Sequence, residues 1–400
     1  MLFNSIYLHN FLSYGNAPPE TATVVLQPLN VLIGPNASGK SNLLEAFALL
    51  KHAPSQIQKP IREGGGIEQW LFEGEGGALA PGAQIYVSVP YASKVADTLR
   101  YGLGFGRWGG NGGPFFIDFE ALYYEVREGQ KLLHTDAIYV NADGQKQIRN
   151  ALALQTGAKP IPVKADDDKS ILAQRKDPEQ YPELTYLGEQ FEKIRLYREW
   201  SYGPYAAVRR PCRADLPNNW LEPDASNLPL VLNRLGRDYE AKEKLLEALQ
   251  ELYDGIENYH VDIEGGTAQL FFHEGRRLVP ATRLSDGTLR YLSLLAVLLH
   301  PSPPPLVCIE EPELGLHPDM LPAVAELLKN ASARMQLVVT THSDILVDAM
   351  TDMPEAVLVC EKTPGGSLLR RLEPEQMKPW LEKYRLGELW ISGELGGTRW

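Results

Sequence analysis

Residues 31–47, VLIGPNASGKSNLLEAF, place two glycines, a lysine and a serine between two apolar stretches. The apolar run 31–33 predicts a short buried strand, and the apolar spacing after Ser41 predicts a helix. Between them, residues 34–41 fit the pattern G-x-x-x-x-G-K-[ST] at every fixed position. The backbone N–H groups of such a loop turn toward phosphate oxygens, and the positive end of the following helix adds to the attraction. The stretch therefore predicts a site for a nucleoside triphosphate.

The side chains of this loop have separate expected roles. Lys40 would reach the β- and γ-phosphates, and Ser41 would offer its hydroxyl to Mg²⁺. A glycine-rich turn that contains Lys-Ser by chance is the alternative, and the flanking strand and helix disfavour it. The residues expected to bind the nucleotide here are Asn36, Ala37, Ser38, Gly39, Lys40, Ser41 and Asn42.

Two adjacent carboxylates, Glu310 and Glu311, follow an apolar strand in PPPLVCIEEPELGLHP, residues 303–318. By themselves, paired glutamates at this position are usually a solvated strand end. A nucleotide site, however, needs one carboxylate to hold Mg²⁺ and a second to orient or deprotonate the attacking water. With a phosphate loop in the same chain, the pair is expected to serve these two purposes.

A histidine follows another buried strand, in QLVVTTHSDIL, residues 336–346. A lone histidine in this position is more often structural than catalytic. Open α/β folds nevertheless bind their ligands at the carboxyl ends of the strands, which is where His342 would lie. We therefore predict that His342 belongs to the nucleotide site.

The segment RLSDGTLRYLSLLAVLL, residues 283–299, opens a helix. Ser285 and Asp286 are candidates for its N-cap, just before Gly287. An ordinary capped helix would look the same, so this segment acquires a functional meaning only from its place among the other motifs.

The composition limits the class of protein. The chain has 400 residues, a formal net charge of −12 and three cysteines without C-x-x-C spacing. Nucleic-acid binding would need a local basic patch, since the net charge does not favour it. The cysteine usage indicates a reducing cytoplasm, and the most apolar segment, residues 291–300, is too short to cross a membrane. We expect a soluble cytoplasmic protein with no signal peptide.

The coarse pattern of elements is mixed. Residues 1–34 alternate like strands, and residues 115–140 predict an antiparallel meander with turns at Glu128-Gly129 and Thr135-Asp136. Residues 224–256 predict a pair of helices broken near Gly236.

The order of these motifs resembles that of the ABC-type ATPases, and more narrowly the branch with the RecF, SMC and OLD proteins. The phosphate loop is followed by SILAQ (170–174), LSDGT (284–288), IEEPELGLHP (309–318) and TTHS (340–343). The opening IYLHNFLSYGN (6–16) and the segment LEPDASNLPLVLNRL (221–235) are also similar to this branch. The resemblance spans essentially the whole chain.

This resemblance implies an α/β fold, a P-loop NTPase of the ABC-ATPase type with a mixed central sheet, an antiparallel β lobe and a small helical subdomain. Residues 1–174 would form an N-terminal lobe with the phosphate loop and the β meander. Residues 175–282 would form the helical subdomain. Residues 283–400 would form a C-terminal lobe with the signature segment, the Walker B strand and the histidine.

It also implies ATP and Mg²⁺ as cofactors and a role for each site residue. Lys40 and Ser41 would bind the phosphates and Mg²⁺, and Gln174 would sense the metal and the γ-phosphate. Three further residues complete the expected nucleotide site. Glu310 would support Mg²⁺, Glu311 would position the water, and His342 would contact the γ-phosphate. The family usually has aspartate where this chain has Glu310, whose side chain is one methylene longer.

Two protomers in this family sandwich two nucleotides, so Ser285 and Gly287 would act on the ATP of the partner subunit. The segment LSDGT differs from the transporter-type Leu-Ser-Gly-Gly-Gln, because Asp286 brings a negative charge to the interface. This difference disfavours the nucleotide-binding subunit of a transporter.

The resemblance leads us to expect an ATPase whose ATP-driven dimer, or larger homo-oligomer, is read by a separate effector in anti-phage defence or genome maintenance. The alternative is a RecF-like DNA-binding clamp, with RRPCR at residues 209–213 as its basic footprint. No long coiled coil, no metal-binding TOPRIM pattern and no membrane segment is recognised, so a DNA-embracing arm and a nuclease domain are not expected.

Overall fold

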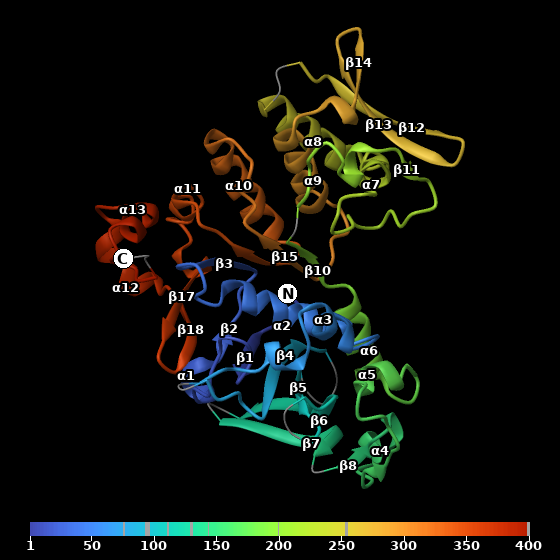
Figure 1. Ribbon diagram of the computed structural model, residues 1–400, viewed down its shortest axis with the longest axis vertical. Coiled ribbons are helices and arrows are strands. Elements are labelled where there is room, and N and C mark those ends of the chain that lie inside the picture. Colours follow the sequence, from blue (N-terminus) through green and yellow to red (C-terminus); the bar gives the residue numbers. More distant parts are fainter. Residues whose placement is uncertain are drawn as a thin grey trace. The chain divides into compact units, whose positions relative to one another are not determined.

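The computed structural model divides into two compact units (Figure 1). The first unit comprises Met1–Ile194, Glu355–Glu373 and Gly393–Trp400, and the second comprises Arg195–Pro354 and Pro374–Ser392. The structure describes residues 1–74, 77–92, 97–109, 112–128, 131–142, 144–198, 200–252 and 255–397. No helix in these described stretches is both long and apolar enough to span a membrane.

The first unit contains an antiparallel sheet of eight strands. Its strand order is β2-β1-β4-β5-β6-β7-β8-β9. The bounds are β1 (Ser5–His9), β2 (Val24–Val25), β4 (Gly82–Pro90), β5 (Thr98–Arg107), β6 (Phe115–Glu128), β7 (Lys131–Ala142), β8 (Gln145–Ile148) and β9 (Ile161–Pro162). β6 pairs antiparallel with β7, which confirms antiparallel strands within residues 115–140. The turn predicted at Thr135-Asp136 is wrong, because β7 continues through these residues, and the turn predicted at Glu128-Gly129 lies partly outside the described residues.

The phosphate-loop strand β3 (Leu29–Ile33) pairs in parallel with β17 (Val357–Thr363), which pairs antiparallel with β18 (Gly366–Arg371). Every residue of β3 is buried, which confirms the buried strand predicted for residues 31–33. The helices of this unit are α1 (Pro19–Ala22), α2 (Lys40–His52), α3 (Gln58–Glu63), α4 (Ala151–Thr156), α5 (Ile171–Gln174) and α6 (Pro182–Glu192).

Aromatic rings hold the helices of the first unit to its N-terminal segment. Phe47 of α2 stacks on Phe3 with 5.4 Å between ring centroids, and Phe191 of α6 lies 5.7 Å from Phe3 on the same measure. All three rings are buried. The apolar residues that predicted a helix after Ser41 are buried in α2.

The second unit contains three parallel strands in the order β10 (Arg195–Tyr197), β15 (Leu306–Glu310) and β16 (Gln336–Thr340). Helices α9 (Asp286–Leu298) and α10 (Leu321–Ser332) belong to this unit, as do the shorter α11 (Asp344–Asp348), α12 (Pro374–Leu381) and α13 (Leu386–Ile391). Both β15 and β16 end at the predicted site segments. Glu310 is the last residue of β15, and Thr341 follows β16 directly.

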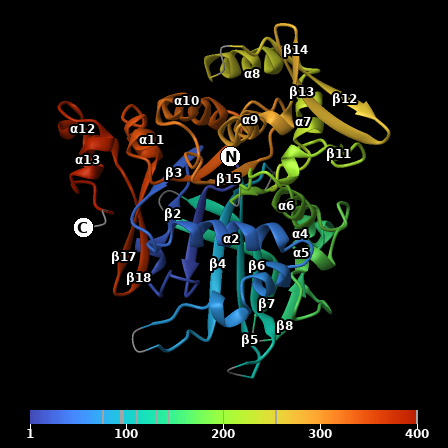
Figure 2. The ribbon, with the colours of Figure 1, turned by 45° about the horizontal axis from the view of Figure 1, so that its top comes forward.

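A small antiparallel sheet of β11 (Cys212–Arg213), β12 (Asn258–Glu264), β13 (Thr267–Glu274) and β14 (Arg277–Pro280) also lies in the second unit. Figures 1 and 2 show α7 (Leu228–Leu235) beside this sheet, and α7 and α8 (Tyr239–Leu252) confirm the predicted helical pair. The segment 175–282, expected to be helical, therefore contains these four strands and β10 as well. The sequence signal for β13 was the two-residue spacing of Ala268, Leu270 and Phe272, which the structure buries more deeply than their neighbours.

Candidate nucleotide-binding and catalytic sites

The backbone of the phosphate loop requires its two fixed glycines. Gly34 has a φ of 142° and Gly39 a φ of 113°, a region that residues with a Cβ rarely adopt. A Cβ on Gly34 would come within 2.3 Å of the carbonyl oxygen of Cys360, and one on Gly39 within 2.5 Å of Ser367 Oγ. Ala37 also has a positive φ, of 61°. The loop is thus a tight main-chain cradle rather than an ordinary turn.

Lys40 lies inside this cradle. Its side chain is buried, and Nζ donates hydrogen bonds to the carbonyl oxygens of Gly34 (2.8 Å) and Pro35 (2.9 Å). Helix α2 begins at Lys40, and no side chain caps its N-terminus, so its positive end faces the loop. A buried ammonium and a helix N-terminus in a glycine-bound loop fit the phosphates of a nucleotide.

Residues from the N-terminal segment and from β18 support the loop. Ser13 Oγ accepts hydrogen bonds from Asn42 Nδ2 and from Ser367 Oγ, both at 2.8 Å, and Tyr14 donates through its hydroxyl to the carbonyl of Gly39 (3.0 Å). Asn42, predicted to bind the nucleotide, therefore has a structural bond to Ser13. The sequence assigned no role to Ser13, Tyr14 or Ser367, because nothing local links them to the loop.

Cys360 holds the loop from β17. Its Sγ donates to the carbonyl oxygen of Ser38 at 3.0 Å. Burial raises the pKa of the Cys360 thiol, which therefore keeps the proton that it donates. Among the described residues, the Ser38 hydroxyl is buried and has no hydrogen-bond partner.

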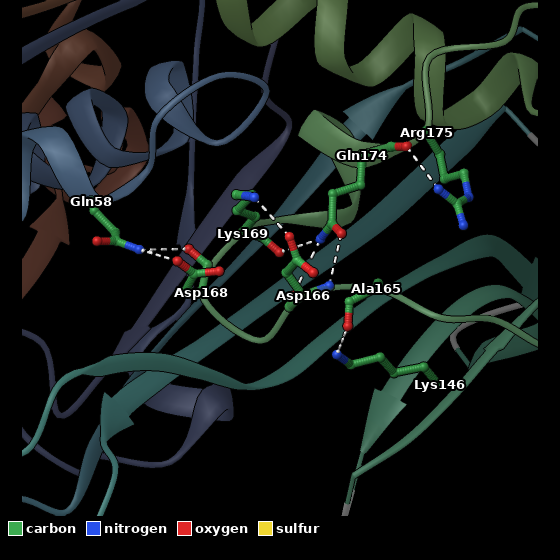
Figure 3. A network of polar contacts seen from close by, with 8 residues as sticks. All are labelled: Gln58, Lys146, Ala165, Asp166, Asp168, Lys169, Gln174 and Arg175. Carbon is green, nitrogen blue, oxygen red and sulfur yellow. Dashed lines mark hydrogen bonds and ion pairs between the residues drawn. The ribbon is translucent and has the colours of Figure 1, made fainter.

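Gln174 ends α5 and bonds to the segment that precedes this helix (Figure 3). Its Oε1 accepts from the backbone N–H of Asp166 (2.8 Å), and its Nε2 donates to the carbonyl oxygens of Lys169 (2.8 Å) and Asp166 (3.3 Å). Lys169 forms an ion pair with Asp166 at 2.7 Å, and Gln58 donates to Asp168. In this structure Gln174 closes an acidic loop, and its predicted contact with Mg²⁺ stays a prediction.

A buried carboxylate anchors the start of α5. Glu120 of β6 is 1% exposed and accepts hydrogen bonds from Tyr101 (2.6 Å), from the Ser170 hydroxyl (2.5 Å) and from the backbone N–H of Ile171 (2.8 Å). Burial raises the pKa of Glu120. The sequence analysis missed Glu120, since its partners Ser170 and Ile171 lie about fifty residues farther along the chain.

The two adjacent glutamates of the second unit have different surroundings. Glu310 Oε2 accepts from Arg198 Nε at 3.0 Å, so this expected metal ligand is part of an ion pair. Glu311 has a φ of 47°, and its N–H donates to the carbonyl of Thr340 (3.0 Å) at the end of β16. A left-handed backbone at a residue other than glycine costs free energy and is often found at active sites.

Glu311 and His342 lie together, as the sequence predicted. His342 Nε2 is 3.5 Å from Glu311 Oε1. Glu313 holds the histidine segment, because its Oε1 accepts from the backbone N–H of His342 (2.7 Å) and from the hydroxyl of Thr341 (2.8 Å). Burial raises the pKa of Glu313, and the nearby Glu311 raises it further. Sequence reasoning passed over Glu313, although it is the third acidic residue of the EEPE segment.

The signature segment is a capped helix start. Ser285 is the N-cap of α9 and accepts from the backbone N–H of Thr288 at 3.1 Å. Arg209 donates to the carbonyl oxygen of Leu284 at 2.7 Å and forms an ion pair with Asp286. A Cβ on Gly287 would come within 3.0 Å of the carbonyl oxygen of Gly315.

The basic run 209–213 is largely occupied by contacts within the chain. Arg209 binds the signature segment, and Arg213 pairs with Asp215 at 2.5 Å. These ion pairs disfavour the DNA-binding footprint that the sequence left open, since the paired acids cancel most of the local positive charge.

A family model described as "AAA domain, putative AbiEii toxin, Type IV TA system" matches residues 29–99 and 166–348. A comparison with curated proteins finds no match.

Two solved structures share the fold. The SMC head bound to the C-winged helix domain of ScpA has a TM-score of 0.57 at 15% identity, with 94% of this chain and 99% of that chain covered. The Smc head domain with an extended coiled coil bound to the C-terminal domain of ScpA, derived from Pyrococcus furiosus, has a TM-score of 0.56 at 14% identity, with 96% and 99% covered.

The fold and the phosphate loop define a P-loop protein with the fold of the SMC head domains. Within that class, the chain belongs to the family of AAA domains described as putative AbiEii toxins of a Type IV TA system. Both the resemblance inferred from the order of the motifs and the α/β fold class are confirmed.

Proposed function

We propose that this chain binds ATP and Mg²⁺ through its phosphate loop, hydrolyses the ATP, and closes into a dimer that a separate effector protein reads. The observation that carries the proposal is the pair of Glu311 and His342, 3.5 Å apart, in a chain whose Lys40 is buried inside a phosphate loop. Membership of an AAA ATPase family supports the same conclusion.

The donors fit the expected cofactors. Mg²⁺ prefers oxygen ligands, and the candidates are the Ser41 hydroxyl, the Gln174 amide oxygen and the Glu310 carboxylate. Bound Mg²⁺ would neutralise charge on the phosphate oxygens. Gln174 would have to leave its bonds to Asp166 and Lys169, and Glu310 would have to share its oxygens with Arg198.

Each protein group near the chemistry has a defined task in this proposal. Lys40 neutralises the β- and γ-phosphates through charge-assisted hydrogen bonds. Glu311 accepts the proton of the attacking water as a general base. His342 donates toward the γ-phosphate, while Glu313 holds the backbone of the histidine segment in place.

Dimerisation follows from the signature segment. Ser285 and Gly287 would bind the γ-phosphate held by the second copy, because a capped helix N-terminus attracts anions.

The SMC heads that share this fold were solved with ScpA domains, which supports a partner protein. The proposed setting is anti-phage defence or genome maintenance, and the family description, which names a putative toxin of a Type IV TA system, supports the first of these. Three free, buried cysteines support a reducing cytoplasm as the location.

The test is Glu311→Gln, which preserves size and hydrogen bonding but removes the charge that accepts a proton. Phosphate release from Mg-ATP should fall by roughly two to four decades, as expected for the loss of a general base, while ATP affinity measured by calorimetry stays within about threefold. Glu243→Gln, an exposed residue of α8, is the matched control and should hydrolyse ATP at the wild-type rate. Wild-type hydrolysis by Glu311→Gln would refute the assigned role of Glu311.

A further inference from the structure

Arg290 joins the signature helix to the loop that carries the catalytic candidate. It lies one turn into α9 and is 9% exposed. Its Nη1 donates a hydrogen bond to the carbonyl oxygen of Leu314. Leu314 follows Glu313 directly, so a single side chain connects the first turns of α9 to the segment after β15.

Two aromatic rings hold the guanidinium in position. Arg290 Cζ lies 5.9 Å from the ring centroid of Trp200 and 5.9 Å from that of Tyr202, and these two rings stack on each other. A planar guanidinium gains both cation–π and stacking energy in such a site. The position of the cation is therefore set by packing as well as by its hydrogen bond to Leu314.

The charge of Arg290 acts on the acidic loop. Burial lowers the pKa of the guanidinium, whereas Tyr202, Glu313 and Glu311 raise it. An arginine stays protonated in proteins, so a permanent positive charge faces two carboxylates of the candidate site. Among the described residues, Arg290 Nε is buried and has no hydrogen-bond partner.

The loop also touches the first turn of α9 through glycines. Gly315 has a φ of 72°, and a Cβ on it would lie 3.4 Å from Arg290 Nη1. A Cβ on Gly287 would lie 3.0 Å from the carbonyl oxygen of Gly315. The loop and the first turn of α9 therefore lie so close together at these glycines that little room is left for a side chain.

We propose that Arg290 is a positioning residue that couples the signature helix to Glu311. This coupling role rests on the proposed function, because it assumes that Glu311 activates water and that the start of α9 meets a second nucleotide. Contact of Ser285 and Gly287 with that nucleotide would fix the first turn of α9. Arg290 would then fix the backbone at Leu314 and, through it, the orientation of the Glu311 carboxylate.

The experiment measures steady-state ATP hydrolysis of the full chain with Arg290→Met, Arg290→Lys and the control Arg334→Met. Arg334 donates to the carbonyl oxygens of Leu298 and His300 at the opposite end of α9, so it makes the same kind of bond away from the acidic loop. Arg290→Met should lower kcat by about 10- to 100-fold, the cost of a slightly misplaced catalytic group, with KM within about threefold. Arg290→Lys should recover part of this loss because it keeps the charge, and Arg334→Met should keep the wild-type kcat.

The double variant Arg290→Met/Glu311→Gln distinguishes positioning from general damage. If Arg290 acts through Glu311, the double variant should hydrolyse ATP as slowly as Glu311→Gln and no more slowly. If Arg290→Met lowers kcat in the Glu311→Gln background by the same factor as in the wild type, the inference is overturned. The same holds if Arg290→Met leaves the wild-type kcat unchanged, and in both cases the proposed function stands. A wild-type chain without ATPase activity would overturn the proposed function, and the inference with it.

Discussion

Arg209 forms an ion pair with Asp286, the acidic residue that distinguishes this signature segment from the transporter type. The same guanidinium donates to the carbonyl oxygens of Tyr202 and Leu284, so its position is fixed by the backbone on both sides. The acidic side chain is 63% exposed, and its ion pair therefore contributes little to the free energy of unfolding. In the proposed closed dimer, this ion pair would offset the negative charge of Asp286 beside the ATP of the second copy.

The first prediction follows from this pair. Arg209→Ala should weaken ATP-driven dimerisation, because the uncompensated Asp286 carboxylate repels the γ-phosphate. The fraction of dimer is measured by light scattering against ATP concentration in the Glu311→Gln background, and the curve should move to higher ATP. Arg209→Ala/Asp286→Asn should restore it. If the double variant is as weak as Arg209→Ala, the charge of Asp286 is not the cause.

The second prediction concerns Lys40. Replacing it with alanine removes the ammonium that lies inside the phosphate loop, and a hydrogen bond to a charged group contributes about 1.5–3 kcal/mol. ATP affinity in isothermal titration should fall by at least roughly tenfold. Lys59→Ala in α3, an exposed lysine, should bind like the wild type. Equal affinity of Lys40→Ala and Lys59→Ala for ATP would rule out the phosphate-loop assignment.

The third prediction tests the closed dimer. Glu311→Gln with Mg-ATP should shift from a monomeric to a dimeric mass, or from a dimer to a larger closed assembly, because uncleaved ATP bridges the two copies. Ser285→Arg in the same background should abolish the shift by placing bulk and charge at the N-terminus of α9. Ser302→Arg, at an exposed loop position, should leave it intact. A mass that is indifferent to ATP would contradict the dimer model.

The fourth prediction compares two buried glutamates. Glu120 anchors the start of the helix that ends at Gln174, whereas Glu183, a residue of α6, accepts a 2.5 Å hydrogen bond from Tyr124. Glu120→Gln should raise the Mg²⁺ concentration for half-maximal hydrolysis by roughly tenfold, as supporting residues of metal sites do. Glu183→Gln should leave the Mg²⁺ dependence unchanged. If both variants, or neither, change that dependence, Glu120 has no specific link to Gln174.

Part of the site could be predicted because its parts are consecutive in the chain. The strand β3, the loop with Gly34 and Gly39, and the helix that begins at Lys40 depend on local backbone preferences, which the residue types disclose. The ends of β15 and β16 were also predictable, since short apolar runs followed by polar residues mark where buried strands finish. For the same reason Glu311 and His342 were both expected at one sheet edge, and the structure places them together.

Only the tertiary structure decided which side chains support these groups. Arg290 meets Leu314, Glu313 meets Thr341, and Arg209 meets Asp286 across separations that no periodic pattern encodes. Glu120 likewise reaches Ser170 from a different strand, and Gln174 proves to be bonded within its own loop. Local sequence determines backbone conformation, because φ and ψ depend on neighbouring residues. Partners of buried charges are set by how the elements pack, because each buried donor or acceptor needs a partner wherever the fold supplies one.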